Sequence, residues 1–111
     1  MTLDDLRAYG AHVDEGLGRC MGMEAMYLKL VGTVKTDATY ERLERALAEN
    51  DLDDAFEAAH ALKGVLGNLA LTPLYEPMYE MTELLRARTQ TDYAPLLATI
   101  QERRAQLIAL M

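Results

Sequence analysis

Apolar residues recur every three or four positions along most of the chain, which is the spacing of amphipathic helices. The pattern predicts two short N-terminal helices and then four longer ones, at about 2–9, 24–34, 38–49, 51–71, 73–88 and 92–110. Because the joints between the long helices are short, neighbouring helices should run antiparallel. We therefore predict an all-α fold of one domain, 1–111. It consists of an up-down antiparallel four-helix bundle at about 38–110, with additional short N-terminal helices at about 2–35.

Helix-capping residues stand at several of the predicted boundaries. The side chains of Thr2 and Asp51 are suited to accept hydrogen bonds from the first turn of a helix. Asn50 suits a left-handed position that ends the helix before it. Thr72 is predicted as an N-cap, because Pro73 follows it at the first helical position.

Glycines predict a loop between the two N-terminal helices, since Gly10, Gly16, Gly18 and Gly22 interrupt that stretch repeatedly. His12 and Cys20 lie in the same segment. No Cys/His cluster accompanies them, and no His/Asn set indicates cysteine catalysis, so we expect surface or packing roles for both. No metal site is predicted in this chain.

The helix predicted at 24–34 carries a methionine-rich apolar stripe. Its members recur at spacings of three and four: Met23, Met26, Tyr27, Leu30, Val31 and Val34. Such a stripe most often fills a core, and we predict that role. A docking groove for a partner is the alternative.

Charge and composition restrict the classes of partner. The chain carries a net charge of −7 and no basic stripe, which argues against nucleic acid and anionic lipid as partners. No signal peptide is recognisable, and no apolar run is long enough to span a membrane. A single cysteine excludes an internal disulfide. We expect a cytoplasmic protein, and a monomer because no long apolar stripe is left over.

The helix predicted at 51–71 places a histidine on its polar side. When the helix is wound at about 100° per residue, one broad side is apolar: Ala55, Ala59, Leu62, Val65, Leu66 and Leu69. His60, Gly64 and Gly67 fall together on the other side, with Lys63 at their edge. The histidine therefore faces water beside two positions that have no side chain.

These glycines need a reason, because each costs a helix roughly 1 kcal/mol relative to alanine. The simplest functional reason is clearance. Bare backbone at Gly64 and Gly67 lets another molecule approach His60, whose imidazole can act as a nucleophile. Lys63, one turn on, is placed to neutralise an anion such as a phosphoryl group. A histidine that is structural or merely exposed is the alternative.

The motif carries a family resemblance. His60-Ala-Leu-Lys63-Gly64, followed by Gly67-Asn68 and Leu71, resembles the His-x-Leu-Lys-Gly signature of histidine phosphotransfer (HPt) domains. Three other stretches also look like that family: 14–17, 24–31 and 48–51. In total the similarity covers about 3–110. One departure is visible, since that family often has small or hydroxyl residues where this chain has Val65 and Leu66. Both fall on the apolar side, so we expect altered core packing and an intact site.

The resemblance implies a phosphohistidine mechanism. His60 would accept a phosphoryl group, through Nε2 of a neutral imidazole, from an aspartate of a response-regulator receiver domain and pass it to a second receiver. A hybrid sensor histidine kinase is a further candidate partner. Lys63 would offset phosphoryl charge, and Gly64 and Gly67 would provide clearance. Receiver docking or ring orientation is expected from the flanking residues, which are Phe56, Glu57, Ala61 and Asn68. The chain has no nucleotide loop, so we expect the receiver to supply Mg²⁺ and the acidic pocket.

Two other classes remain open. One is a domain of the same fold that a chemotaxis-type histidine kinase phosphorylates from ATP through its catalytic domain. The other is a helical adaptor without chemistry, whose partner binding would not depend on His60.

Overall fold

The computed structural model describes residues 1–111, and it is built from helices alone. The seven helices are α1 (Leu3–Tyr9), α2 (Val13–Arg19), α3 (Glu24–Thr36), α4 (Thr39–Ala48), α5 (Leu52–Asn68), α6 (Thr72–Arg86) and α7 (Ala94–Ile108). The predicted all-α class is therefore confirmed. None of these helices combines the length and the apolar content needed to cross a membrane.

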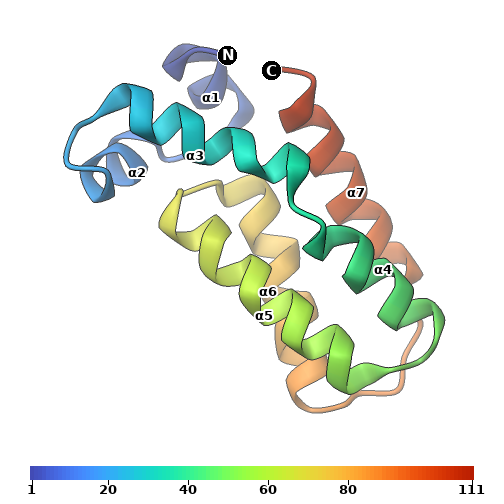
Figure 1. The fold of residues 1–111 in the computed structure, drawn as a ribbon. Coiled ribbons are helices and arrows are strands. Elements are labelled where there is room, and N and C mark those ends of the chain that lie inside the picture. The colour runs from blue at the N-terminus through green and yellow to red at the C-terminus, as the bar shows by residue number, and fades with distance from the viewer.

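Helices that follow one another in the chain also pack against one another. α4 packs on α5, α5 on α6 and α6 on α7, and α3 contributes a further contact to α7 (Figure 1). α1 and α2 lie at one end of the molecule, where the N- and C-termini also lie (Figure 1). Side chains from all seven helices or their caps join one buried cluster. α5, which carries His60, thus lies between two neighbours and exposes only part of its surface.

Local sequence signals account for several helix ends. Thr2 and Asp5 form a reciprocal capping box at the start of α1. Asp51 accepts a hydrogen bond from the Asp54 amide at 3.1 Å and so caps α5. Asn50 adopts a left-handed φ of 52° directly before that cap. The predicted roles of Thr2, Asn50 and Asp51 are confirmed.

The loop predicted from the N-terminal glycines is wrong, because Val13–Arg19 forms α2. Gly16 is buried within this helix, and a Cβ placed there would lie 2.6 Å from the Tyr27 ring and 2.7 Å from the Leu69 carbonyl oxygen. The glycine therefore permits close packing of α2 on α3 and on the end of α5. His12 and Cys20 are the N-cap and C-cap of this helix rather than loop residues.

The N-terminal helices satisfy the carbonyl groups at the end of α5. The last carbonyls of a helix have no partner within the helix and must find one elsewhere. The Arg19 guanidinium donates to the Gly67 carbonyl, and the Tyr27 hydroxyl donates to the Leu69 carbonyl at 2.8 Å. The His12 amide donates to the Ala70 carbonyl at 3.0 Å. These bonds hold the turn after α5 in place, and α5 ends at Asn68 instead of the predicted Leu71.

The boundary between α5 and α6 also differs from the prediction. Thr72 is the first residue of α6, and the N-cap position belongs to Leu71. The Thr72 hydroxyl points back to the Ala70 carbonyl at 3.5 Å and caps nothing. Leu71 is fully buried, so tertiary packing rather than a capping side chain fixes this start.

The methionine-rich stripe is only half buried, which corrects the predicted core role for part of it. Tyr27, Val31 and Val34 are buried, but Met23, Met26 and Leu30 are 41–50% exposed. The stripe is wider than the surface that the rest of the molecule offers to α3. Val65 departs from its prediction in the same way: it lies at the edge of the apolar side of α5 and is 40% exposed, whereas Leu66 is fully buried.

Candidate functional site

His60 lies at the middle of α5 with its side chain exposed. The opposite side of the helix is anchored in the core by Ala55, Ala59, Leu62 and Leu66, all buried. This burial fixes the rotation of α5 about its axis, so that the imidazole must face outward. The predicted placement of the histidine on the polar side of the helix is confirmed.

The two glycines next to His60 have different surroundings. A Cβ added at Gly64 would meet nothing within 4 Å, so the backbone there borders open space. A Cβ added at Gly67 would lie 3.2 Å from the Tyr75 ring. Gly64 therefore leaves room for an incoming molecule. Gly67, for which the same clearance was expected, makes room for a side chain of α6 and accepts the hydrogen bond from Arg19.

An aromatic ring lies against the imidazole of His60. The rings of Phe56 and His60 are stacked, with their centroids 5.6 Å apart and their planes 18° from parallel. The two residues are four apart on α5, which brings side chains together on one helix face. Glu57, the candidate for orienting the ring through Nδ1, makes no hydrogen bond to His60. The structure thus gives the histidine an aromatic neighbour in place of a carboxylate.

Lys63 extends along the helix surface toward α6. Its Nζ lies 5.7 Å from the centroid of the Tyr79 ring, within the range of a cation–π contact. Tyr79 in turn lies near Tyr75, with ring centroids 6.1 Å apart. The ammonium group is therefore held near the surface, one helical turn from His60.

Two arginines lie close to the ring of Phe56: Arg86 is the last residue of α6, and Arg88 lies in the turn that follows it. The guanidinium carbons of Arg86 and Arg88 lie 5.1 and 5.0 Å from the centroid of its ring. Arg88 also donates to Asp53 at 2.6 Å, which ties the end of α6 to the first turn of α5. Because both guanidinium groups contact Phe56, they lie on the same side of α5 as His60.

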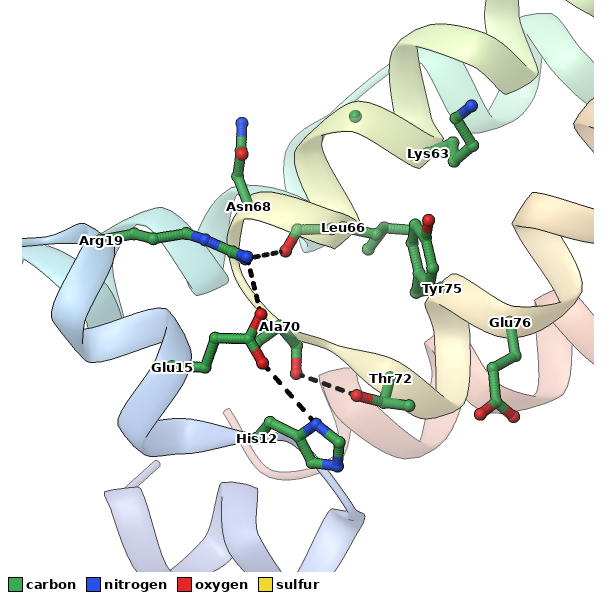
Figure 2. A pocket seen from close by; sticks show the side chains of 12 residues that line it. His12, Glu15, Arg19, Lys63, Leu66, Asn68, Ala70, Thr72, Tyr75 and Glu76 are labelled. Atoms are coloured by element: carbon green, nitrogen blue, oxygen red, sulfur yellow. Dashed lines mark hydrogen bonds and ion pairs between the residues drawn. The ribbon is translucent and has the colours of Figure 1, made fainter.

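A cleft of about 500 Å³ opens one helical turn beyond His60, and Figure 2 shows the residues that line it. It lies between α2, the C-terminal half of α5 and the start of α6, and Lys63, Gly64 and Tyr75 are among its lining residues. The side chain of Arg19 reaches from α2 to the end of α5 (Figure 2). Its guanidinium also pairs with Glu15, which lies on α2, at 2.6 Å. His60 does not line the cleft but precedes Gly64 by one turn.

Two of the remaining sequence candidates, His12 and Asn68, line the same cleft. Ala61 and Asn68 are exposed on α5. His12 is an exposed N-cap with its Nδ1 3.8 Å from Glu15, and Cys20 is a buried free thiol. No group of three or more His, Cys, Asp or Glu side chains is arranged to hold a metal ion.

Sequence reasoning missed the contribution of α6 to the site. Phe56, His60, Lys63 and Gly67 share one face of α5. Three of them lie against side chains of α6: Gly67 against Tyr75, Lys63 against Tyr79, and Phe56 against Arg86. We call this contact line the α5–α6 seam. The α6 residues recur at spacings of four and seven, so a helical wheel shows them on one face. Only the register of α6 against α5 reveals what they contact.

The arrangement can perform nucleophilic chemistry on a group brought from outside. The imidazole is exposed, the backbone one turn on is bare, and a cation lies beside that opening. A phosphoryl group on the ring would carry negative charge, which Lys63 can offset.

Comparison with known families agrees with this geometry. The family model described as the Hpt domain matches residues 34–110, which include the end of α3 and all of α4–α7. The resemblance noted at 14–17 and 24–31 lies outside that match. No curated protein and no solved structure matches the chain. Since the match spans more than half of the 111 residues, the chain belongs to the Hpt domain family, whose members take part in histidine phosphotransfer in two-component signalling.

Proposed function

We propose that this protein relays a phosphoryl group between aspartates of receiver domains through a phosphohistidine at His60. The observation that carries the proposal is the pairing of an exposed histidine with open space at Gly64 and with Lys63 beside it. Membership of the family indicates the class of reaction, which is phosphotransfer, and the geometry of the site supports His60 as the residue that carries the phosphoryl group. The receivers can be separate proteins or part of a hybrid sensor histidine kinase.

The transfer balances without any group beyond the two partners. Nε2 of neutral His60 attacks the phosphorus of an aspartyl phosphate in line with the leaving oxygen. The P–Nε2 bond forms as the P–O bond breaks, and the electron pair leaves on the aspartate carboxylate. The reverse step, on a second receiver, regenerates the free imidazole. Lys63 offsets charge on the phosphoryl oxygens while the group resides on His60.

Mg²⁺ and the acidic pocket come from the receiver in this proposal. On this chain Phe56 lies against His60, and the side chains that follow along the seam are aromatic or cationic: Lys63, Tyr79 and Arg86. The role left to this chain is to provide the nucleophile and a docking face. We further propose that α4–α7 form the up-down bundle that holds the site and that α1–α3 cover one end of it, as a monomer.

Transfer from phosphorylated receivers of the source organism tests the proposal. Wild type and His60→Gln are mixed with each phosphorylated receiver, and circular dichroism verifies that both proteins keep their helix content. We expect at least one receiver to label wild type and none to label the variant. Label retained by folded His60→Gln would overturn the assignment.

A second arm separates the alternatives. A chemotaxis-type kinase catalytic domain with ATP replaces the receivers. Labelling of wild type only in this arm would replace the relay with a kinase-fed domain. No labelling in either arm, together with partner binding that ignores His60, would favour an adaptor.

A further inference from the structure

We propose that Phe56 is a positioning residue that holds the His60 imidazole in the orientation required for transfer, and that Arg86 and Arg88 hold Phe56 in turn. This inference rests on the proposed function, since it specifies how the same site is kept ready. Its basis is the near-parallel stack of the two rings and the two guanidinium groups about 5 Å from the Phe56 ring.

His60 needs such support because no other group restrains it. Its side chain is exposed and makes no hydrogen bond within the chain. An exposed side chain of this kind exchanges between rotamers within picoseconds to nanoseconds. A ring stacked at an offset restricts that motion from one side of the imidazole. Both ring nitrogens lie in the ring plane, so a neighbour on the face leaves them accessible to phosphorus.

Phe56 is itself fixed by two helices. Its backbone belongs to α5 and its ring is half-buried, while Arg86 approaches from the last turn of α6 and Arg88 from the turn after that helix. Arg88 is anchored by hydrogen bonds to Asp53 and to the Leu85 carbonyl, each at 2.6 Å. Cation–π contacts favour this arrangement of guanidinium groups and aromatic ring. The orientation of His60 is thereby coupled to the register of α6 against α5.

Two other roles for Phe56 give different results. A docking residue would change the affinity for the receiver, and a purely structural residue would change folding stability. A positioning residue changes the rate of transfer within the complex and the environment of the His60 ring. The variants that separate these roles are Phe56→Leu, which removes the aromatic ring but keeps an apolar helix former, and Phe56→Tyr, which keeps the ring.

The first experiment measures receiver affinity and the single-turnover transfer rate separately. For Phe56→Leu we expect the rate constant within the complex to fall about tenfold, because misplacement of a reacting group is costly. Receiver affinity should stay within about twofold of wild type. Phe56→Tyr should restore the rate. A weaker affinity with an unchanged rate would overturn the proposal in favour of docking. A wild type that accepts no phosphoryl group would instead refute the proposed function.

The second experiment needs no phosphotransfer. In proton NMR spectra, the Hδ2 and Hε1 resonances of His60 should carry a ring-current shift and show nuclear Overhauser effects to the Phe56 ring. The shift should disappear in Phe56→Leu, persist in Phe56→Tyr and shrink in Arg86→Gln. His60 resonances that are the same in wild type and folded Phe56→Leu would show that the rings do not stack in solution and would overturn the proposal.

Discussion

Gly64 is one of three helical glycines, with Gly18 and Gly32, at which an added Cβ would meet nothing within 4 Å, and it is the one that lies one turn from His60. A glycine inside a helix costs about 1 kcal/mol relative to alanine, and a Cβ at this position would meet nothing. Gly16, by contrast, is required by the Tyr27 ring and the Leu69 carbonyl that lie against it. Packing in the folded protein therefore does not require a glycine at position 64, whereas access to His60 does.

Substitutions at Gly64 should separate folding from function. We expect both Gly64→Ala and Gly64→Leu to fold, and Gly64→Ala to gain up to about 1 kcal/mol in the free energy of unfolding. Gly64→Leu should block transfer sterically, while Gly64→Ala should retain part of it. Urea titration and single-turnover transfer measure the two effects. Wild-type transfer by folded Gly64→Leu would show that clearance is not the role of the glycine.

Lys63 should act on transfer rather than on stability. Its ammonium group lies on the surface against Tyr79, where a cation–π contact contributes on the order of 1 kcal/mol or less. Lys63→Gln should therefore lower the transfer rate about tenfold with little change in unfolding. Lys63→Arg keeps the charge and serves as the matched control. Equal transfer rates for Lys63→Gln and wild type would show that Lys63 does not contribute to phosphotransfer.

At the residue scale, the sequence predicts the α5 half of the site and not the α6 half. His60, Lys63 and Gly64 are close in sequence, so helical periodicity alone places them together. Tyr79 and Arg86 reach the site only through the register of α6, which depends on packing across the whole interface. The stack of Phe56 on His60 depends on side-chain rotamers, which no spacing rule specifies.

α2 shows at the element scale why glycine is an ambiguous signal. Gly16 and Gly18 weaken the helical pattern, yet this segment is helical because it packs on α3 and on the end of α5. The hydrogen bonds of Arg19 and Tyr27 to the carbonyls of Gly67 and Leu69 reinforce that packing. Caps such as Thr2 and Asp51 act locally and could be predicted, whereas α2 depends on tertiary contacts and could not.

The two glycines of α2 form a matched pair for testing this explanation. Gly16→Ala should cost about 1–3 kcal/mol of unfolding free energy, because its Cβ would overlap the Tyr27 ring and a backbone oxygen. Gly18→Ala meets nothing within 4 Å and should be neutral or stabilise by up to about 1 kcal/mol. Urea denaturation of both variants measures the difference. Equal stabilities would mean that α2 does not pack tightly in solution.

For the molecule as a whole, two tyrosines, the partly buried Tyr9 and the buried Tyr40, join distant parts of the chain. The Tyr9 hydroxyl donates to the Arg103 carbonyl at 2.8 Å, which ties α1 to α7. Tyr40 on α4 packs under Arg104 of α7, with 4.1 Å from the guanidinium carbon to the ring centroid. Burial raises the pKa of Tyr9 to about 12 and also raises the pKa of Tyr40 above its ordinary value.

These shifts predict a loss of stability in alkali. Below about pH 10, a free tyrosine is protonated in both the folded and the unfolded state, so the contribution of Tyr9 is fully present. Between pH 10 and about 12, the unfolded chain loses this proton while the folded protein keeps it, so stability falls as the pH rises. The unfolding free energy of wild type should fall more steeply there than that of Tyr9→Phe. Parallel pH profiles would contradict the burial of this hydroxyl group.

The all-helical class could be predicted at this scale because helical periodicity runs through most of the chain. The exposed part of α3 could not, because Met23, Met26 and Leu30 have the same spacing as the buried side chains beside them. Which part of a stripe is buried depends on how much surface the neighbouring helices cover.

The most direct test of the central claim is to locate the phosphoryl group on the protein. The chain has two histidines, so wild type, His60→Gln and His12→Gln, labelled with ¹⁵N-histidine and phosphorylated by a receiver, cover both. We predict an acid-labile, base-stable group on Nε2 of His60 in wild type and His12→Gln, visible as shifted ring nitrogens, and none in His60→Gln. A phosphoryl group on His12, on a carboxylate, or on folded His60→Gln would contradict the account.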